Sequence, residues 1–197
     1  LVAAGVYVDE YSANKLKSLG VKDSKLLSDS KALELSDMIL NICRGQYSII
    51  EISPEKYNNL YEQFRNENKN LNTLLAWGHA KAIEEILSKR ECKLAIADQF
   101  ADKRFIMSAL QEKGRNVTLT QVHKAEEHIA VAAASVLARA RFLLKLKKLS
   151  EDLGIDLPKG ASLKVITTAQ RIVDERGKGA LRQVAKLHFK ITANIRM

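Results

Sequence analysis

Residues 93–122 read KLAIADQFADKRFIMSALQEKGRNVTLTQV, and this stretch decides the fold class. The apolar run Lys93–Ala97 predicts a short buried strand ending at Asp98. A helix is predicted over Asp102–Glu112, and a second strand over Val117–Val122. Strand–helix–strand units build parallel or mixed sheets, and their ligands sit beyond the carboxyl ends of the strands. We therefore expect an α/β fold with a site near Asp98.

The flanking sequence continues the alternation of strands and helices. Before this stretch we expect a strand over Leu1–Val8, a helix over Ser28–Cys43, a strand in YSIIEIS, a helix starting at Ser53-Pro54 and a long helix after Asn72. After it we expect a helix over Glu126–Leu149, a helix around Val165–Arg176 and a basic strand in AKLHFK. The sequence shows no repeat and no linker, so we predict one domain over residues 1–197.

Composition limits the classes of protein that fit. The 32 Lys and Arg outnumber the 23 Asp and Glu, and the net charge of +9 favours polyanionic partners. No apolar run is long enough to span a bilayer, so we expect no membrane partner. The two cysteines lack metal-binding or secreted-disulfide spacing, which favours a cytoplasmic location. The opening LVAAGVYVDE begins in mid-strand and is typical of a fragment.

Acidic residues provide the candidate chemistry. Asp98 ends the first strand of the unit, and Glu126 and Glu127 follow the second. Carboxylates that converge there could hold Mg²⁺, which prefers oxygen ligands. In the alternative interpretation, Asp98 caps a turn and the two Glu residues favour a helix amino end. Asp102 fits a helix cap better than a metal ligand.

Two further groups of residues have alternative interpretations. The loop Lys22–Lys25 (KDSK) offers two ammonium groups and a hydroxyl to phosphate, or it is a solvated turn. His188 and Phe189 lie in a basic terminal segment with Lys186 and Lys190, where Phe189 is expected to be a core anchor and the alternative is a platform on which a base stacks. Core packing is also the role expected for Trp77.

Several segments together resemble the type 2 ribonuclease H family, and within it ribonuclease HIII. They are VYVDE, GVKDSKLL, ISPEKYNNLY, LNTLLAWGHAKAIE, DQF, KAEEHIAVAAASVLAR, LPKGAS and AKLHFK, in the family's order and over almost the whole chain. DQF, KAEE, SPEKYN and KLHFK resemble the HIII forms. The resemblance implies a ribonuclease H-like mixed sheet flanked by helices.

The resemblance also implies an activity. It is the endonucleolytic cleavage of the RNA strand of RNA–DNA hybrids by two divalent metal ions, Mg²⁺ or Mn²⁺, leaving 5′-phosphate and 3′-hydroxyl ends. Asp98 matches the third acidic ligand of the family and Glu126 the fourth, with Glu127 as the other register. Lys22, Asp23, Ser24 and Lys25 match its substrate loop, and Lys124 and Arg139 are expected to contact phosphate. No obligate protein partner is evident.

The sequence departs from the family at its start. The first two acidic ligands belong to an Asp-Glu-x-Gly segment that is expected before Leu1, as is the glycine-rich loop that reads ribose 2′-hydroxyls. Asp9-Glu10 lies in the wrong part of the motif to replace them. We therefore expect the chain alone to be inactive or nearly so. The alternative hypothesis is a non-catalytic protein that binds RNA–DNA hybrids.

Overall fold

The structure, a computed structural model, describes residues 1–195 except the side chains at positions 126, 193 and 194. Its internal contacts divide the chain into two compact units. The sheet unit comprises Val2–Glu51 and Leu71–Arg141, and the helical unit comprises Leu1, Ile52–Asn70 and the chain from Phe142 onward. The prediction of a single domain over residues 1–197 stays a prediction, and each unit is described by itself.

The sheet unit holds all the strands of the described chain. In order, it contains β1 (Val2–Val6), α1 (Glu10–Ser18), η1 (Ser24–Leu26), α2 (Asp29–Ile42), β2 (Tyr47–Glu51), α4 (Leu71–Leu87), β3 (Leu94–Asp98), α5 (Arg104–Ala109), η2 (Gly114–Asn116), β4 (Thr118–Val122), η3 (Ala125–Glu127) and the first part of α6 (Ile129–Leu153). The expected α/β class and the strands on either side of α5 are therefore confirmed.

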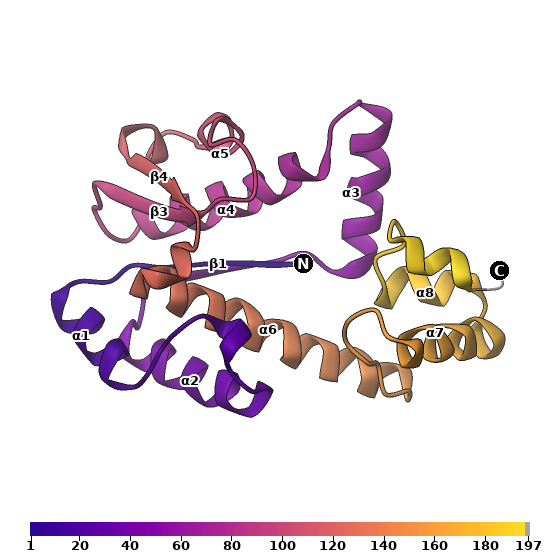
Figure 1. The fold of residues 1–197 in the computed structure, drawn as a ribbon. Coiled ribbons are helices and arrows are strands. Elements are labelled where there is room, and N and C mark those ends of the chain that lie inside the picture. The colour runs from indigo at the N-terminus through magenta and orange to yellow at the C-terminus, as the bar shows by residue number, and fades with distance from the viewer. Residues whose placement is uncertain (196–197) are drawn as a thin grey trace. The chain divides into compact units, whose positions relative to one another are not determined.

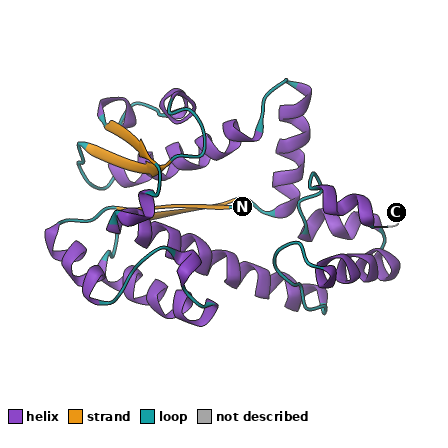
Figure 2. Cartoon of the chain, in the orientation of Figure 1, coloured by secondary structure: helices purple, strands orange, loops and turns teal. Residues whose placement is uncertain are grey.

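The four strands form two separate two-stranded sheets (Figure 2). β1 and β2 are antiparallel, with Val2 opposite Glu51 and Val6 opposite Tyr47. β3 and β4 are parallel, with Leu94 aligned to Thr118. The parallel pair follows from the strand–helix–strand order, because a crossover helix returns the chain to the same end of the sheet.

Strand β1 lies between two helices. Its Ala3 and Gly5 approach α4, since a Cβ added at Gly5 would lie 2.8 Å from Ile86 Cδ1. Its Ala4 and Val6 belong instead to a core that includes Val136 and Leu137 of α6. Alternate residues of a strand point to opposite faces, so α4 covers one face of β1 and α6 the other. Figure 1 shows the two helices on opposite sides of β1.

The helical unit packs around its own apolar cluster. It contains α3 (Pro54–Asn66), the last part of α6, α7 (Leu163–Arg176), α8 (Lys178–Val184) and η4 (Lys190–Asn194). Leu153, Ile172 and Leu181 are buried in the cluster. Helix α3 begins as expected, because Ser53 Oγ accepts a hydrogen bond from the amide of Lys56 at 3.2 Å and Pro54 occupies the first turn. None of the helices in the described residues is both long and apolar enough to cross a bilayer.

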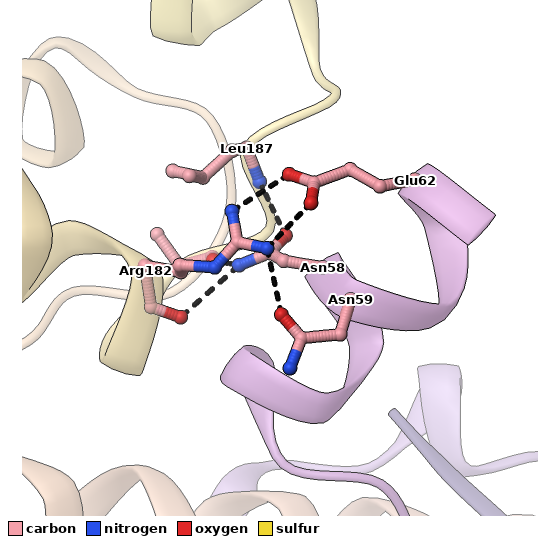
Figure 3. A network of polar contacts seen from close by, with 6 residues as sticks. Asn58, Asn59, Glu62, Arg182 and Leu187 are labelled. Carbon is pink, nitrogen blue, oxygen red and sulfur yellow. Dashed lines mark hydrogen bonds and ion pairs between the residues drawn. The ribbon is translucent and has the colours of Figure 1, made fainter. Parts of the chain in front are cut away.

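The strand predicted in AKLHFK is wrong. Residues 185–189 form bends and a turn at 187–188, and Asn58 of α3 binds backbone groups in and just before this segment (Figure 3). The buried Asn58 amide donates to the carbonyls of Arg182 and Ala185 and accepts from the amide of Leu187 at 3.0 Å. These bonds occupy groups that a strand would present to a neighbour. The alternation of apolar and polar residues in AKLHFK therefore belongs to a turn that is bound by Asn58, and not to a strand.

Four other predictions are corrected. The helix expected from Glu126 begins at Ile129, after the short 3₁₀ turn η3. Trp77 is 42% exposed and Phe189 is 52% exposed, so neither is the core anchor that was expected. The helix predicted over Asp102–Glu112 is shorter, at Arg104–Ala109.

Candidate active site

Asp98 is the last residue of β3, at the carboxyl end of the parallel pair. Its side chain is exposed, and its Oδ1 accepts a hydrogen bond from the following amide, Gln99, at 3.0 Å. No salt bridge to this carboxylate occurs within the described residues. The turn-capping interpretation thus accounts for one oxygen, and the carboxylate stays accessible to a cation.

The second candidate ligand lies in η3, the turn that packs against β3. Lys124 precedes the turn with a left-handed backbone (φ 55°), and His128 is extended, so the turn is separated from α6. A non-glycine residue in this region of φ costs free energy, which the surrounding contacts must offset. The backbone of Glu126 therefore lies near β3, but its side chain is outside the described residues. Glu127 is exposed.

A histidine that sequence reasoning left without a role lies near Asp98. The ring of His79, on α4, stacks on Phe100 at a centroid distance of 5.0 Å. Burial lowers the pKa of His79, and the negative charge of Asp98 opposes that shift. His79 thus favours its neutral form despite the nearby carboxylate. Its only signal in the sequence was a polar residue within the largely apolar stretch of α4.

The described residues do not by themselves assemble a two-metal site. No group of three or more Asp, Glu, His or Cys side chains among them is close enough to hold one ion. Asp98 supplies an oxygen ligand of the kind that Mg²⁺ and Mn²⁺ prefer. A complete site therefore needs carboxylates beyond those described.

The Lys22–Lys25 loop combines exposed cations with a buried hydroxyl residue. Lys22 and Lys25 are exposed, whereas Ser24 is only 8% exposed. Asp23 Oδ1 accepts from the amide of Lys25 at 3.0 Å and so caps the turn η1. The amide of Ser24 donates to Ser135 Oγ of α6 at 3.2 Å. The loop is thus a fixed turn that presents two ammonium groups.

Arg139 of α6 holds the same loop. Its guanidinium donates to the carbonyl oxygen of Ser24 and pairs with Asp29 at 2.8 Å. The side chain is 24% exposed. Lys124, the other cation expected to contact phosphate, is exposed beside η3. The substrate roles of these residues stay predictions.

Comparison with known proteins gives a consistent picture. The profile of the family described as ribonuclease HII matches residues 1–192. The chain is 45% identical to ribonuclease HIII of Protochlamydia amoebophila (strain UWE25) and 40% identical to that of Chlamydia felis (strain Fe/C-56). Each match covers 96% of this chain but only 61% and 62% of the relatives, so the chain spans about three-fifths of their length.

The fold is similar to a solved structure. Bst-RNase HIII in complex with Mn²⁺ superimposes with a TM-score of 0.86 and 30% sequence identity, covering 98% of this chain and 63% of that one. The likeness extends over both the β strands and the helices described above.

Proposed function

This chain belongs to the ribonuclease HII family, and we propose that it forms part of an endoribonuclease that cleaves the RNA strand of RNA–DNA hybrids. The observation that carries the proposal is Asp98, an accessible carboxylate at the carboxyl end of β3 with η3 packed beside it. Ligands of α/β units gather at this end of the strands. Similarity to ribonuclease HIII supports the choice of substrate.

Asp98 and Glu126 are the two ligands that this chain contributes to the metal site in the proposal. Bound Mg²⁺ or Mn²⁺ supplies an activated water and stabilises the departing 3′ oxygen, which gives 5′-phosphate and 3′-hydroxyl ends. The Mn²⁺ complex of a relative supports a divalent ion without separating the two metals. The hydrogen bond from the Gln99 amide orients the carboxylate of Asp98.

Lys22 and Lys25 contact phosphate in this proposal, and Asp23 and Ser24 hold the turn that presents them. Lys124 and Arg139 extend the phosphate contacts. Cations of this kind position the duplex and add affinity that weakens with salt.

The activity belongs to a longer protein in this proposal. The one Asp-Glu-x-Gly sequence in residues 1–197, Asp174–Gly177, ends helix α7 and does not follow a strand, and the described residues gather no metal-binding cluster. We therefore expect the 197-residue chain to bind hybrids but to cleave them slowly or not at all.

The first test measures cleavage of a labelled RNA–DNA hybrid in Mg²⁺ or Mn²⁺. A protein extended by an Asp-Glu-x-Gly segment from a relative is compared with the chain alone. We expect cleavage only from the extended protein, and Asp98→Asn in it should abolish cleavage while leaving hybrid binding intact. The matched control is Asp102→Asn, because Asp102 binds Arg104 within its own turn. Full cleavage by the Asp98→Asn variant would overturn the metal assignment.

Glu126→Gln and Glu127→Gln form a second matched pair. The two residues are neighbours in η3, so both substitutions lie in the same turn and each removes one negative charge. We expect only Glu126→Gln to abolish cleavage, and the opposite result would assign the ligand to Glu127.

The alternative is a hybrid-binding protein without catalysis. The net charge of +9 favours it, because positive charge alone gives affinity for nucleic acid. Hybrid binding by both proteins with no metal-dependent cleavage by either would establish this alternative.

A further inference from the structure

Aromatic rings gather in the helical unit, where α3 meets the segment after α8. Tyr57 and Tyr61 are four positions apart in α3 and therefore lie on one face of the helix. The centroid of the His188 ring lies 5.5 Å from that of Tyr57 and 4.7 Å from that of Tyr61. Phe189 adds a further ring at 4.1 Å from His188. These four residues are called the aromatic row.

The row is held in place from below and is open at one end. Asn58, the neighbour of Tyr57 in α3, accepts a hydrogen bond from the amide of Leu187 at 3.0 Å, directly before His188 (Figure 3). Tyr57 is 4% exposed, whereas Phe189 is 52% exposed. A single exposed Phe is ordinary on a protein surface, but this ring continues a row that is already fixed. A ligand that stacks on it would order few side chains on binding.

The surroundings of the row are positively charged. The Nζ atom of Lys186 lies 4.5 Å from the centroid of the Tyr57 ring, and Lys190, next to the row in sequence, is exposed. Residues 52–70 and 142–197 of the helical unit contain 15 Lys and Arg but 8 Asp and Glu. This unit thus carries +7 of the net charge of +9, so its surface favours an anionic ligand.

His188 contributes a ring and not a second charge. Burial and the charge of Lys186 lower the pKa of His188, so the ring is neutral at pH 7. Its Nδ1 atom is buried and has no hydrogen-bond partner among the described residues. The ligand that fits an exposed ring on a neutral aromatic base, with cations nearby, is therefore both flat and anionic. Unpaired nucleotides have these properties, whereas the bases of a duplex cover one another's faces.

We propose that Phe189 and His188 form a stacking platform for the unpaired bases of single-stranded nucleic acid, with Lys190 beside the phosphates. Stacking reads neither the base nor the ribose 2′-hydroxyl, so DNA and RNA of equal length should bind alike. The inference goes beyond the proposed function, since a single strand offers no hybrid to cleave.

The first test compares two labelled probes on the parent chain in EDTA. One is a ten-nucleotide oligothymidylate, and the other is an abasic strand with the same phosphates. Fluorescence anisotropy should show at least about tenfold weaker binding of the abasic strand, because only stacking is lost. An oligouridylate of the same length should bind within about threefold of the DNA. Equal binding of the thymidylate and abasic probes would overturn the proposal, and so would binding of only one of DNA and RNA.

The second test removes the exposed ring. Phe189→Leu should weaken thymidylate binding at least about tenfold and leave abasic binding unchanged, whereas Phe189→Trp should retain thymidylate binding. Phe142→Leu is the matched control, because Phe142 is a 42% exposed ring on α6 outside the row. Unchanged thymidylate binding by Phe189→Leu would overturn the platform.

A tryptophan reporter locates the bound base. Trp77 is the only tryptophan of the chain, so a variant with Trp77→Phe and Phe189→Trp emits from the platform alone. We expect the thymidylate to quench this emission and the abasic strand to leave it unchanged. Emission that changes with protein concentration in the absence of probe would contradict the platform, because a second copy would then cover the ring.

Hybrid binding separates this inference from the proposed function. Phe189→Leu should bind a long RNA–DNA hybrid as the parent chain does, because paired bases hide their faces. If hybrids bind but single strands ignore the ring, the platform fails and the proposed function stands. Equal losses on hybrid and single strand would also contradict the platform, because the ring would then serve duplex binding or the fold.

Discussion

Arg139 connects helix α6 to the Lys22–Lys25 loop and to the first residue of α2, Asp29, through two different acceptors. One nitrogen donates to the carbonyl oxygen of Ser24, and the other pairs with the carboxylate of Asp29. A guanidinium can make both contacts at once because its donors form a rigid fork. The family resemblance predicts a phosphate contact for Arg139. The structure gives it a positioning contact with the loop, and this contact can be tested separately.

We expect Arg139→Leu to lower the free energy of unfolding by about 1–3 kcal/mol, because the Ser24 carbonyl and Asp29 lose a partly buried charged donor. The free energy of unfolding of Arg139→Lys should lie between those of the parent chain and Arg139→Leu, since one ammonium cannot reproduce the fork of donors. Urea titration measures the loss, and hydrogen exchange should show faster exchange in Ser24–Leu26. Unchanged exchange in this turn would contradict the positioning role.

The two cysteines should differ sharply in reactivity. Burial, and to a lesser extent the charge of Asp9, raises the pKa of the Cys43 thiol to about 11. The thiolate is the reactive form, so at pH 8 Cys43 should resist iodoacetamide while the half-exposed Cys92 reacts. The raised pKa also means that the unfolded chain loses this proton first, so stability should fall as pH rises from 9 towards about 11. Equal labelling of both cysteines in the folded protein would contradict the burial of Cys43.

At the scale of elements, α3 and the segment after α8 are held together by Asn58. This side chain is 3% exposed, donates to the carbonyl oxygens of Arg182 in α8 and of Ala185, and accepts from the amide of Leu187 (Figure 3). The neighbouring Arg182 forms a charged contact with Glu62 at 2.6 Å on the surface. Two separated motifs, ISPEKYNNLY and AKLHFK, therefore meet in the helical unit.

We expect Asn58→Ala to destabilise the protein by about 2–4 kcal/mol, because it leaves buried backbone groups without partners. Asn59→Ala is the matched control. Asn59 is exposed, and its side chain accepts a hydrogen bond from the Arg182 side chain, so its loss should cost less than about 1 kcal/mol. Urea titration of both variants measures the difference. Similar costs for the two would show that the Asn58 bonds contribute little.

Elements with local signals could be predicted from the sequence. Ser53-Pro54 begins α3 because the capping hydroxyl and the missing proline amide act within one turn. The turns around AKLHFK could not be predicted, because their partner is Asn58, more than a hundred positions earlier in the chain. The start of α6 was misplaced because Lys124 has a left-handed backbone, which is uncommon for a residue other than glycine.

At the scale of the whole molecule, strand order predicted where Asp98 lies. The parallel β3–β4 pair follows from the strand–helix–strand sequence, and Asp98 ends β3 as expected. The packing of His79 against Phe100 had no local signal, since it depends on how α4 meets the segment after β3. The division of the strands into two separate sheets was also unexpected, because the hydrophobic pattern of a sequence predicts strands but not which strand edges remain unpaired.

Net charge acts over the whole molecule, so the affinity for RNA–DNA hybrids should depend on the salt concentration. Each phosphate that a cation neutralises releases counterions, so the logarithm of the hybrid association constant should fall by about 0.9 per contact for each tenfold rise in salt. Lys22→Ala and Lys25→Ala should each reduce this slope by about one contact. Lys147→Ala is the control, because Lys147 pairs with Glu151 on the surface of α6. Equal slopes for all three variants and the parent chain would show that the loop does not contact phosphate, and the affinity would then come from the remaining basic surface.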